Sequence, residues 1–280
     1  MIVRREEIEA LSADIRRIID GQAIDLRDNL EGRLSILKND IHTLAGRLNE
    51  QADNLQKEKL ALADTLADIS HQLKTPLTAM LMMVELLEGA PAEKQAEFIA
   101  NLKQGLAQTG WLVNALLKMA KLDSGTVLFS PAPLTVAELL DVALKPLQIL
   151  LDIKAQEVKL TGEGTLICDK NWTVEALTNI LKNASEHAPA GSVIEVSAGR
   201  NPLCNWITVT DPGRGIPLTE IKGLFQRFGG SRQGTGIGLP LALAIMQGQN
   251  GDIEVDGGGS GKGASFTMKF YESESDKTVT

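Results

Sequence analysis

The chain has 280 residues, which suits two domains and an extension but is short for three domains. Its net charge of −8 argues against generic nucleic-acid binding, because affinity for a phosphate backbone needs clustered Lys and Arg. Hydrophobic residues make up 43% and aromatic residues only 4%, so the core must be aliphatic, which favours helices or an α/β sandwich.

No apolar run reaches the roughly 18 residues of a membrane-spanning helix. The longest, residues 77–87, contains Glu85, and no secretory signal opens the chain. The two cysteines, Cys168 and Cys204, lack the spacing of metal ligands, which fits a reducing cytosol. We therefore expect a soluble chain and leave open a membrane anchor upstream of Met1.

The first half of the chain reads as helices. Residues 1–43 are charged and helical in pattern, and we interpret them as a signal-input segment. From residue 44 a heptad begins, with an apolar seam typical of a coiled coil or bundle. The seam residues spaced by seven are Leu48, Leu55, Leu62 and Ile69.

The heptad register predicts where His71 points. If Leu66 is position a and Ile69 is position d, His71 takes position f, farthest from the seam, and should face water. A second helix is expected over residues 93–122 after a turn at 88–94. One hairpin cannot bury its own apolar stripe, so residues 44–123 are predicted to pair into a dimeric four-helix bundle.

The second half of the chain has a different pattern of predicted secondary structure. Residues 124–134 are punctuated by Pro and Gly and read as a linker. Helical patterns then alternate with short strands over residues 135–272, which predicts an α/β sandwich with a mixed, largely antiparallel sheet. Residues 273–280 form a polar tail that we expect to be disordered. The predicted strands are 158–164, 193–200, 205–211, 251–258 and 264–271.

Several short motifs in the second half are suited to binding a nucleotide. In NILKNASEH, Asn179 and Asn183 lie one helical turn apart and could hold hydrated Mg²⁺ or phosphate oxygens, although the pair taken alone is better explained as two solvated amides. In DPGRGIP, Asp211 could accept a hydrogen bond from an adenine amino group, or merely open an Asp-Pro-Gly turn.

The hexapeptide GTGIGL at residues 234–239 precedes a helical run. Glycines before a helix N-terminus can form an anion site from backbone N–H groups. The pattern lacks the context of a Rossmann fingerprint and the Lys of a Walker loop.

The order of these motifs matters more than any one of them. ISHQLKTPLT resembles the H box of sensor histidine kinases of two-component systems. NILKNASEH resembles the N box, DPGRGI the G1 box, FQRF the F box, GTGIGL the G2 box and GKGASF a third glycine box. The resemblance covers about residues 60–272 and follows the order of the family.

The resemblance implies a phosphoacceptor hairpin followed by an ATP-binding domain of the type shared with Hsp90, gyrase and MutL. It makes His71 the phosphoacceptor, and Asn183 a ligand of Mg²⁺. It implies that Asp211 binds the adenine amino group. The lid between Phe228 and Gly234 is short for the family, and Arg232 within it could touch the phosphates. The residues that it assigns to ATP are Asn179, Lys182, Asn183, His187, Asp211, Gly213, Gly215, Ile216, Phe225, Phe228, Gly234, Thr235, Gly236, Gly238 and Leu239.

One departure from the family pattern concerns the residue after His71. Many relatives carry Glu or Asp there, whereas this chain has Gln72, which cannot act as a base. Thr75 matches the family position associated with phosphatase activity. Gln72 and Thr75 therefore join His71 as predicted catalytic residues.

The predicted function is a histidine kinase that uses ATP and Mg²⁺ to phosphorylate His71 and passes the phosphoryl group to an aspartate of a response-regulator receiver domain. It is predicted to act as a homodimer through residues 44–123, at the cytoplasmic face of the membrane, with a transmembrane sensor upstream of this chain. The alternatives left open are a phosphatase-dominant sensor, an ATPase of the Hsp90/gyrase/MutL class without histidine phosphorylation, and a coiled-coil dimer that binds nucleotide only structurally.

Overall fold

The computed structural model of this chain describes residues 5–19, 22, 24–27, 33–229, 236–258 and 263–271. The chain divides into two compact units, Met1–Ser70 and His71–Thr280, and each is described by itself. Helix α2, Arg33–Glu88, crosses the boundary between them. Among the described residues, no helix combines the length and hydropathy needed to cross a membrane.

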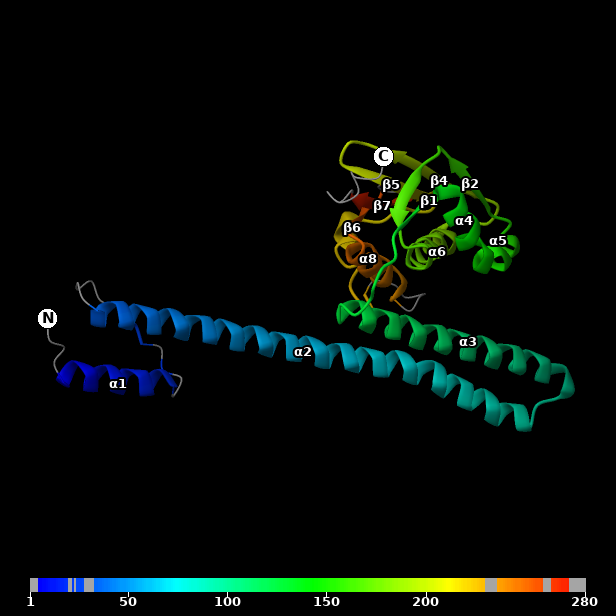
Figure 1. The fold of residues 1–280 in the computed structure, drawn as a ribbon. Coiled ribbons are helices and arrows are strands. Elements are labelled where there is room, and N and C mark those ends of the chain that lie inside the picture. Colours follow the sequence, from blue (N-terminus) through cyan, green and yellow to red (C-terminus); the bar gives the residue numbers. More distant parts are fainter. Residues whose placement is uncertain are drawn as a thin grey trace. The chain divides into compact units, whose positions relative to one another are not determined.

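The first unit is helical. It contains helix α1, Arg5–Ile19, and the N-terminal part of α2 (Figure 1). The heptad residues Leu48, Leu55 and Leu62 are all exposed in the single chain. The apolar seam that the sequence predicts is therefore present on α2 but has no cover from the described residues of its own unit.

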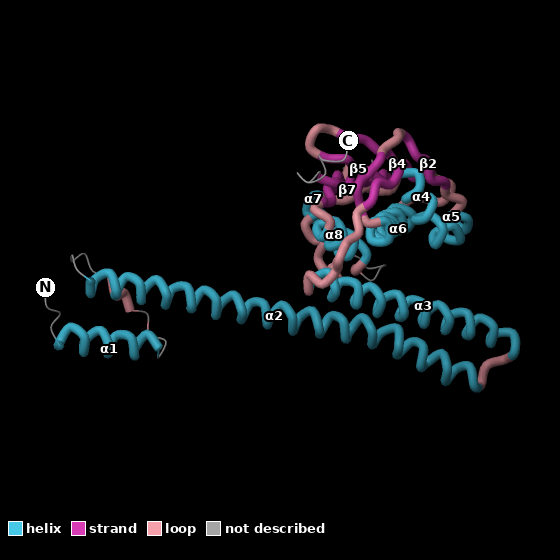
Figure 2. Tube along the Cα trace, viewed as in Figure 1, coloured by secondary structure: helices cyan, strands magenta, loops and turns pink. Residues whose placement is uncertain are grey.

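The second unit begins with a helical hairpin. The C-terminal part of α2 is followed by a short turn and by α3, Ala92–Asp123, close to the predicted bounds (Figure 2). At Gly105 a Cβ atom would lie 2.9 Å from both Cγ and Sδ of Met80. This close approach shows that α2 and α3 pack tightly where α3 carries no side chain.

An α/β domain follows the hairpin. Its helical elements are α4 (Val136–Leu144), the short 3₁₀ turn η1 (Lys145–Leu147), α5 (Gln148–Ile153), α6 (Lys170–His187), α7 (Leu218–Ile221) and α8 (Gly238–Gly248). Its strands are β1 (Ala132–Thr135), β2 (Glu157–Thr161), β3 (Thr165–Cys168), β4 (Val193–Arg200), β5 (Cys204–Asp211), β6 (Gly251–Asp256) and β7 (Ala264–Tyr271).

The main sheet has the strand order β2-β4-β5-β7-β6. The β2–β4 pair is parallel and the other pairs are antiparallel, so the prediction of a mixed, largely antiparallel sheet is confirmed. Strands β1 and β3 form a separate antiparallel pair that the sequence analysis did not predict. Residues 132–134 of the predicted linker therefore belong to a strand.

The core lies between the main sheet and helices α4, α6 and α8 (Figure 1). Leu177 and Ile180 of α6, Leu241 of α8 and Ile207 and Phe266 of the sheet are fully buried. Side chains along β7 alternate between buried and half-buried positions, as expected for a strand with one face on the core. This packing fixes the ends of α6, α8 and β5, where the candidate site lies.

Candidate active site

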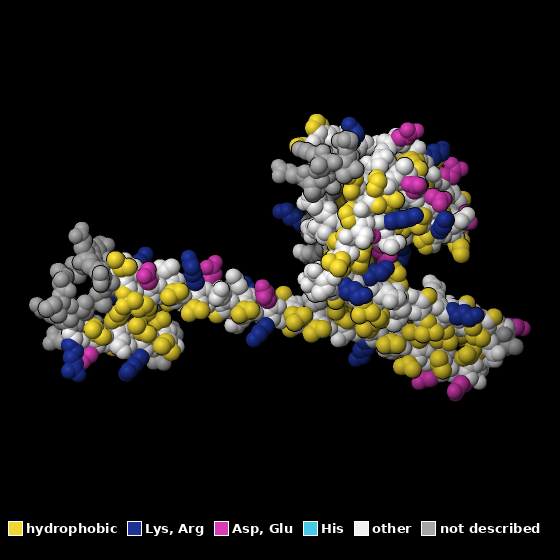
Figure 3. Space-filling view, in the orientation of Figure 1, with side chains coloured by type: hydrophobic (Ala, Val, Ile, Leu, Met, Phe, Trp, Pro, Cys, Tyr) yellow, Lys and Arg dark blue, Asp and Glu magenta, His cyan; other side chains and the backbone are white. Residues whose placement is uncertain are grey.

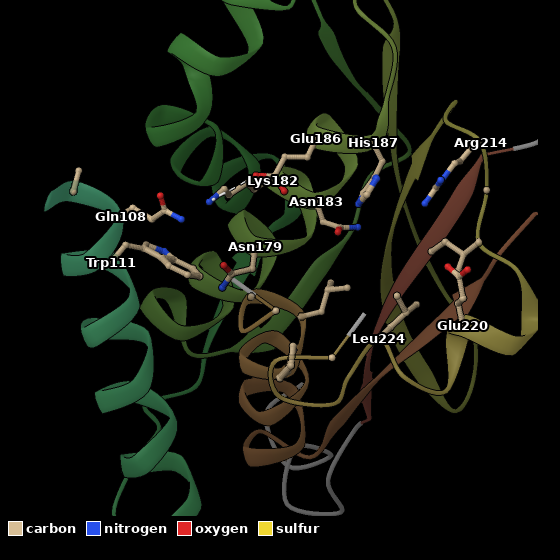
Figure 4. Close-up of a pocket in the computed structure, with 18 of the residues that line it drawn as sticks. Gln108, Trp111, Asn179, Lys182, Asn183, Glu186, His187, Arg214, Glu220 and Leu224 are labelled. Atoms are coloured by element: carbon tan, nitrogen blue, oxygen red, sulfur yellow. Dashed lines mark ion pairs between the residues drawn. The ribbon is translucent and has the colours of Figure 1, made fainter. Parts of the chain in front are cut away.

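A cavity of about 1130 Å³ opens at the ends of these elements (Figure 4). Its volume slightly exceeds the usual range of small-molecule sites, which is roughly 300–1,000 Å³. Its walls come from α6, from the loop after β5, from the start of α8 and from the hairpin helix α3. The lining residues include Asn179, Lys182, Asn183, Glu186, His187, Arg214, Gly215, Ile216, Gly236, Gly238, Leu239, Gln104, Gln108 and Trp111.

Helix α6 presents two predicted amides to the cavity. Asn179 is buried, and its Nδ2 donates to the Glu175 carbonyl at 3.0 Å. Its Oδ1 takes no part in this hydrogen bond. A Cβ atom on Gly238 would lie 3.2 Å from this Oδ1, so the start of α8 lies directly against Asn179. Asn183, one turn along, is half-buried in the same wall.

The N-terminus of α8 borders the cavity through Gly238 and Leu239. Its first backbone N–H groups have no partners within the helix, and the helix dipole adds positive potential there. Such an end favours anions such as phosphate.

Lys182 supplies the positive side chain of the α6 wall. Its Nζ lies 4.9 Å from the ring centroid of Trp111 on α3 and 3.8 Å from a carboxylate oxygen of Glu186. The sequence analysis missed Trp111, because it reads as one more apolar residue beside Leu112. Only the packing of α3 against the α/β domain brings it to the cavity.

Asp211 ends β5 and is only 3% exposed. Its Oδ1 accepts a hydrogen bond from the Gly213 N–H at 2.8 Å. Burial raises the pKa of this carboxyl, while the Gly213 N–H and the nearby His187 oppose the rise. Asp211 and Gly213 are not among the residues that line the cavity; they lie at the start of the loop whose residues 214–216 do.

Two positions of this loop require glycine, one because of a close contact and one because of its backbone conformation. A Cβ atom on Gly213 would lie 2.6 Å from Asp211 Oδ1 and 2.8 Å from the His187 carbonyl oxygen. Gly215 has a φ of +76°, which L side chains rarely adopt. Ile216 then donates its N–H to the Gly257 carbonyl at 2.9 Å, which ties the loop to the end of β6.

The predicted F-box residues lie beside the cavity. Phe225 and Phe228 are half-buried and pack against the core. The Phe228 N–H donates to the Gly236 carbonyl at 3.0 Å, and both residues have positive φ. The predicted residues Gly234, Thr235 and Arg232 lie outside the described residues.

A second cavity, of about 370 Å³, lies in the hairpin and is lined by His71, Gln72, Thr75 and Pro76 of α2. From α3 it is lined by Gln108, Thr109 and Leu112. His71 is exposed, in agreement with its predicted f position, and Gln72 is half-buried. The Thr75 hydroxyl donates to the His71 carbonyl at 3.1 Å. The structure therefore brings the three predicted catalytic residues together.

Within the second unit, α3 also contacts the α/β domain. Leu112, Ala115 and Met119 are buried in the same cluster as the domain core. Lys118 pairs with Glu175 at 2.8 Å, and Arg227 contacts both carboxylate oxygens of Asp123 at 2.7 Å. Figure 3 shows yellow apolar side chains gathered along the hairpin, in contrast to the mixed surface of the α/β domain.

Comparison with known proteins gives two family matches. Residues 61–125 match the His Kinase A (phospho-acceptor) domain. Residues 168–274 match the histidine kinase-, DNA gyrase B- and HSP90-like ATPase family. The chain belongs to the sensor histidine kinases. The predicted family is thus confirmed, whereas the individual roles of its site residues stay predictions.

Similar proteins agree with this membership. The chain is 26% identical over 221 residues to the signal transduction histidine-protein kinase BaeS of Escherichia coli. This alignment covers 78% of this chain and 47% of BaeS. The chain spans less than half the length of the curated relatives it matches first.

Two solved structures share the fold. The histidine kinase ShkA, in complex with AMPPNP, is 25% identical with a TM-score of 0.56, over 74% of this chain and 45% of that one. The histidine kinase ThkA, in complex with the response regulator TrrA, is 16% identical with a TM-score of 0.63, over 80% of this chain and 66% of that one.

Proposed function

We propose that this chain transfers the γ-phosphoryl group of ATP to His71 and then to an aspartate of a response-regulator receiver domain. The observation that carries the proposal is that a nucleotide-sized cavity and the cavity of the exposed His71 both border α3. Residues 44–123 would receive the phosphoryl group, and residues 135–272 would bind ATP.

The residues around the larger cavity suit the parts of ATP. The Asp211 carboxylate would accept a hydrogen bond from the adenine amino group, with Gly213, Gly215 and Ile216 against the base. The phosphates would lie at the N-terminus of α8, near Gly238, with Lys182 and Asn179 beside them. The likeness of the fold to ShkA, which binds AMPPNP, supports this placement.

A magnesium ion fits the same wall. Among the described residues, no group of three or more His, Cys, Asp or Glu side chains could enclose a metal. Magnesium is commonly held by few protein oxygens together with water and substrate phosphates, so the amide oxygen of Asn183 is a suitable ligand. When bound, the ion would neutralise phosphate charge during transfer.

The His71 imidazole would act as the nucleophile. A neutral ring nitrogen carries a lone pair near neutral pH, and the exposed position leaves it open to the phosphoryl group. Gln72 cannot accept a proton as a base, but its amide can orient the ring or a water. Thr75 could help to position a water for dephosphorylation of the regulator.

The partners follow from the chemistry and from the exposed surface. A phosphohistidine must pass its group to another acceptor, and a receiver aspartate is the acceptor that the family implies; ThkA has been solved with its regulator TrrA. A homodimer through residues 44–123 would cover the exposed seam residues such as Leu48 and Leu106. A sensor segment beyond this chain would place it at the cytoplasmic face of the membrane, as for sensor kinases.

The test is incubation of the chain with Mg²⁺ and γ-labelled ATP. We expect label that survives base and is lost in acid, as a phosphoramidate should. His71→Ala should abolish it, whereas His42→Ala, on the same helix, should keep it. Bound ATP with no label on the parent chain would overturn the proposal.

A further inference from the structure

The two cavities of the second unit share one polar residue of α3 whose amide is unpaired. Gln108 lines both the nucleotide cavity and the His71 cavity. Figure 4 shows its side chain reaching from α3 in the direction of Lys182. Gln108 therefore lies on the boundary that a phosphoryl group would cross.

Helix packing explains this position. The close contact of Gly105 with Met80 draws α2 and α3 together. One turn further along α3, Gln108 and Thr109 reach the part of α2 that carries Thr75 and Pro76. A larger residue at Gly105 would require the Met80 side chain to move.

Two of the four other polar side chains that line the His71 cavity, those of Thr75 and Thr109, are already engaged. The Thr75 hydroxyl donates to the His71 carbonyl at 3.1 Å, and the Thr109 hydroxyl donates to the Gly105 carbonyl at 2.9 Å. Within the part of the chain that the structure describes, the Gln108 amide has no hydrogen-bond or ion-pair partner. Its two N–H donors are therefore available to a ligand.

The side chains near Gln108 include one cation, Lys182, whose carboxylate partner Glu186 also lines the nucleotide cavity. Trp111 lies three residues on, on the same face of α3. The Lys182 Nζ lies 4.9 Å from its ring centroid. An ammonium group from α6 and an unpaired amide from α3 thus both border the nucleotide cavity.

We propose that Gln108 is a catalytic residue whose Nε2–H donates a hydrogen bond to an oxygen of the γ-phosphoryl group during transfer to His71 of the same chain. This rests on the proposed function. A ring nitrogen of His71 forms the bond to the γ-phosphorus while the bond from that phosphorus to the bridging oxygen breaks. ADP leaves with the electron pair, and the proton on the other ring nitrogen passes to solvent.

The experiment compares Gln108→Ala with the parent chain in the ATP-labelling reaction. A preorganised donor to a developing oxyanion contributes about 100-fold or more to rate, and a more exposed one less, so we expect labelling slower by about tenfold. ATP affinity should change by less than about twofold, because the interaction strengthens only during transfer. Gln108→Glu should be slower still, since it adds negative charge beside the phosphates.

The control is Asn114→Ala, which removes an exposed amide from α3 outside both cavities. It should label like the parent. A second readout is chemical phosphorylation of His71 by phosphoramidate, which needs no ATP site; Gln108→Ala should match the parent there. An equal loss in both reactions would indicate a structural role and overturn the inference.

Mixed dimers test the same-chain step. His71→Ala mixed with Asn183→Ala should give no label, because neither chain holds both parts; label in the mixture would overturn transfer within one chain. A parent chain without label would refute the proposed function itself. A labelled parent with an equally fast Gln108→Ala would refute only the role of Gln108.

Discussion

The α/β domain buries its large apolar side chains, whereas the hairpin leaves many of its own exposed. The domain buries Leu177, Ile207 and Phe266 completely. The hairpin exposes Leu81 to 65% and Leu106 to 63%. Three of its exposed apolar residues on α3 are spaced by seven: Ile99, Leu106 and Val113. A region that is complete alone folds around its own core, whereas we expect a region with an open heptad seam to be covered by a partner.

The largest expected effect is in the domain core. Leu177→Ala should lower the free energy of unfolding by about 2–5 kcal/mol, because it removes buried methyl groups and leaves a cavity. Chemical denaturation, followed through the unfolding transition of the α/β domain, measures this loss of free energy. The loss should not depend on protein concentration; a concentration-dependent loss would place Leu177 at a subunit interface instead.

The next effect concerns the hairpin seam. Leu106→Glu should weaken dimerisation by about 100-fold, since it places a carboxylate where apolar side chains are expected to meet. Sedimentation measures the dissociation constant. Ala100→Glu, which is exposed on α3 away from this heptad, is the matched control and should leave the dimer intact. A monomeric parent chain would contradict the comparison.

A smaller effect concerns the buried Asp211. Asp211→Asn should weaken ATP binding by about 10–100-fold, as expected for the loss of a charged hydrogen-bond acceptor. Calorimetric titration measures this. At neutral pH the variant should be no less stable than the parent, because burial penalises the charged form.

The pH dependence of Asp211 has a definite sign. Its pKa is raised in the folded state, so its contribution to stability is present at low pH and is lost as the pH rises through the folded pKa. The affinity for ATP should instead fall as the pH is lowered, because protonation of Asp211 removes the acceptor for the adenine amino group. An Asp211→Asn chain with the same acid dependence of binding as the parent would assign that dependence to another group.

The smallest expected effect is at the contact between the two regions. Trp111→Leu removes a cation–π contact of about 0.5–1 kcal/mol, so ATP should bind about two- to fivefold tighter if Lys182 must leave the ring to reach the phosphates. Tryptophan fluorescence of the parent should change on ATP addition and that change should be reduced in the variant. Weaker binding by the variant would mean that Trp111 contacts the nucleotide.

Local patterns predicted much of this molecule. The strand at 264–271, the exposed position of His71 and the helix that follows GTGIGL can each be predicted from neighbouring residues, and the structure agrees with all three. Strand β1 was missed because Pro131 and Pro133 read as breakers, whereas pairing with the distant β3 stabilises it. Gln108 and Trp111 could not be found, because no local signal states which face of α3 meets the α/β domain.

The most direct test of the account is phosphorus NMR of the chain after incubation with Mg²⁺ and ATP. We predict a phosphoramidate resonance in the parent chain that is absent from both His71→Ala and Asn183→Ala. The first variant removes the acceptor and the second the predicted metal ligand. A phosphate ester or acyl phosphate resonance in place of the phosphoramidate, or a phosphoramidate that persists in His71→Ala, would contradict the central role of His71.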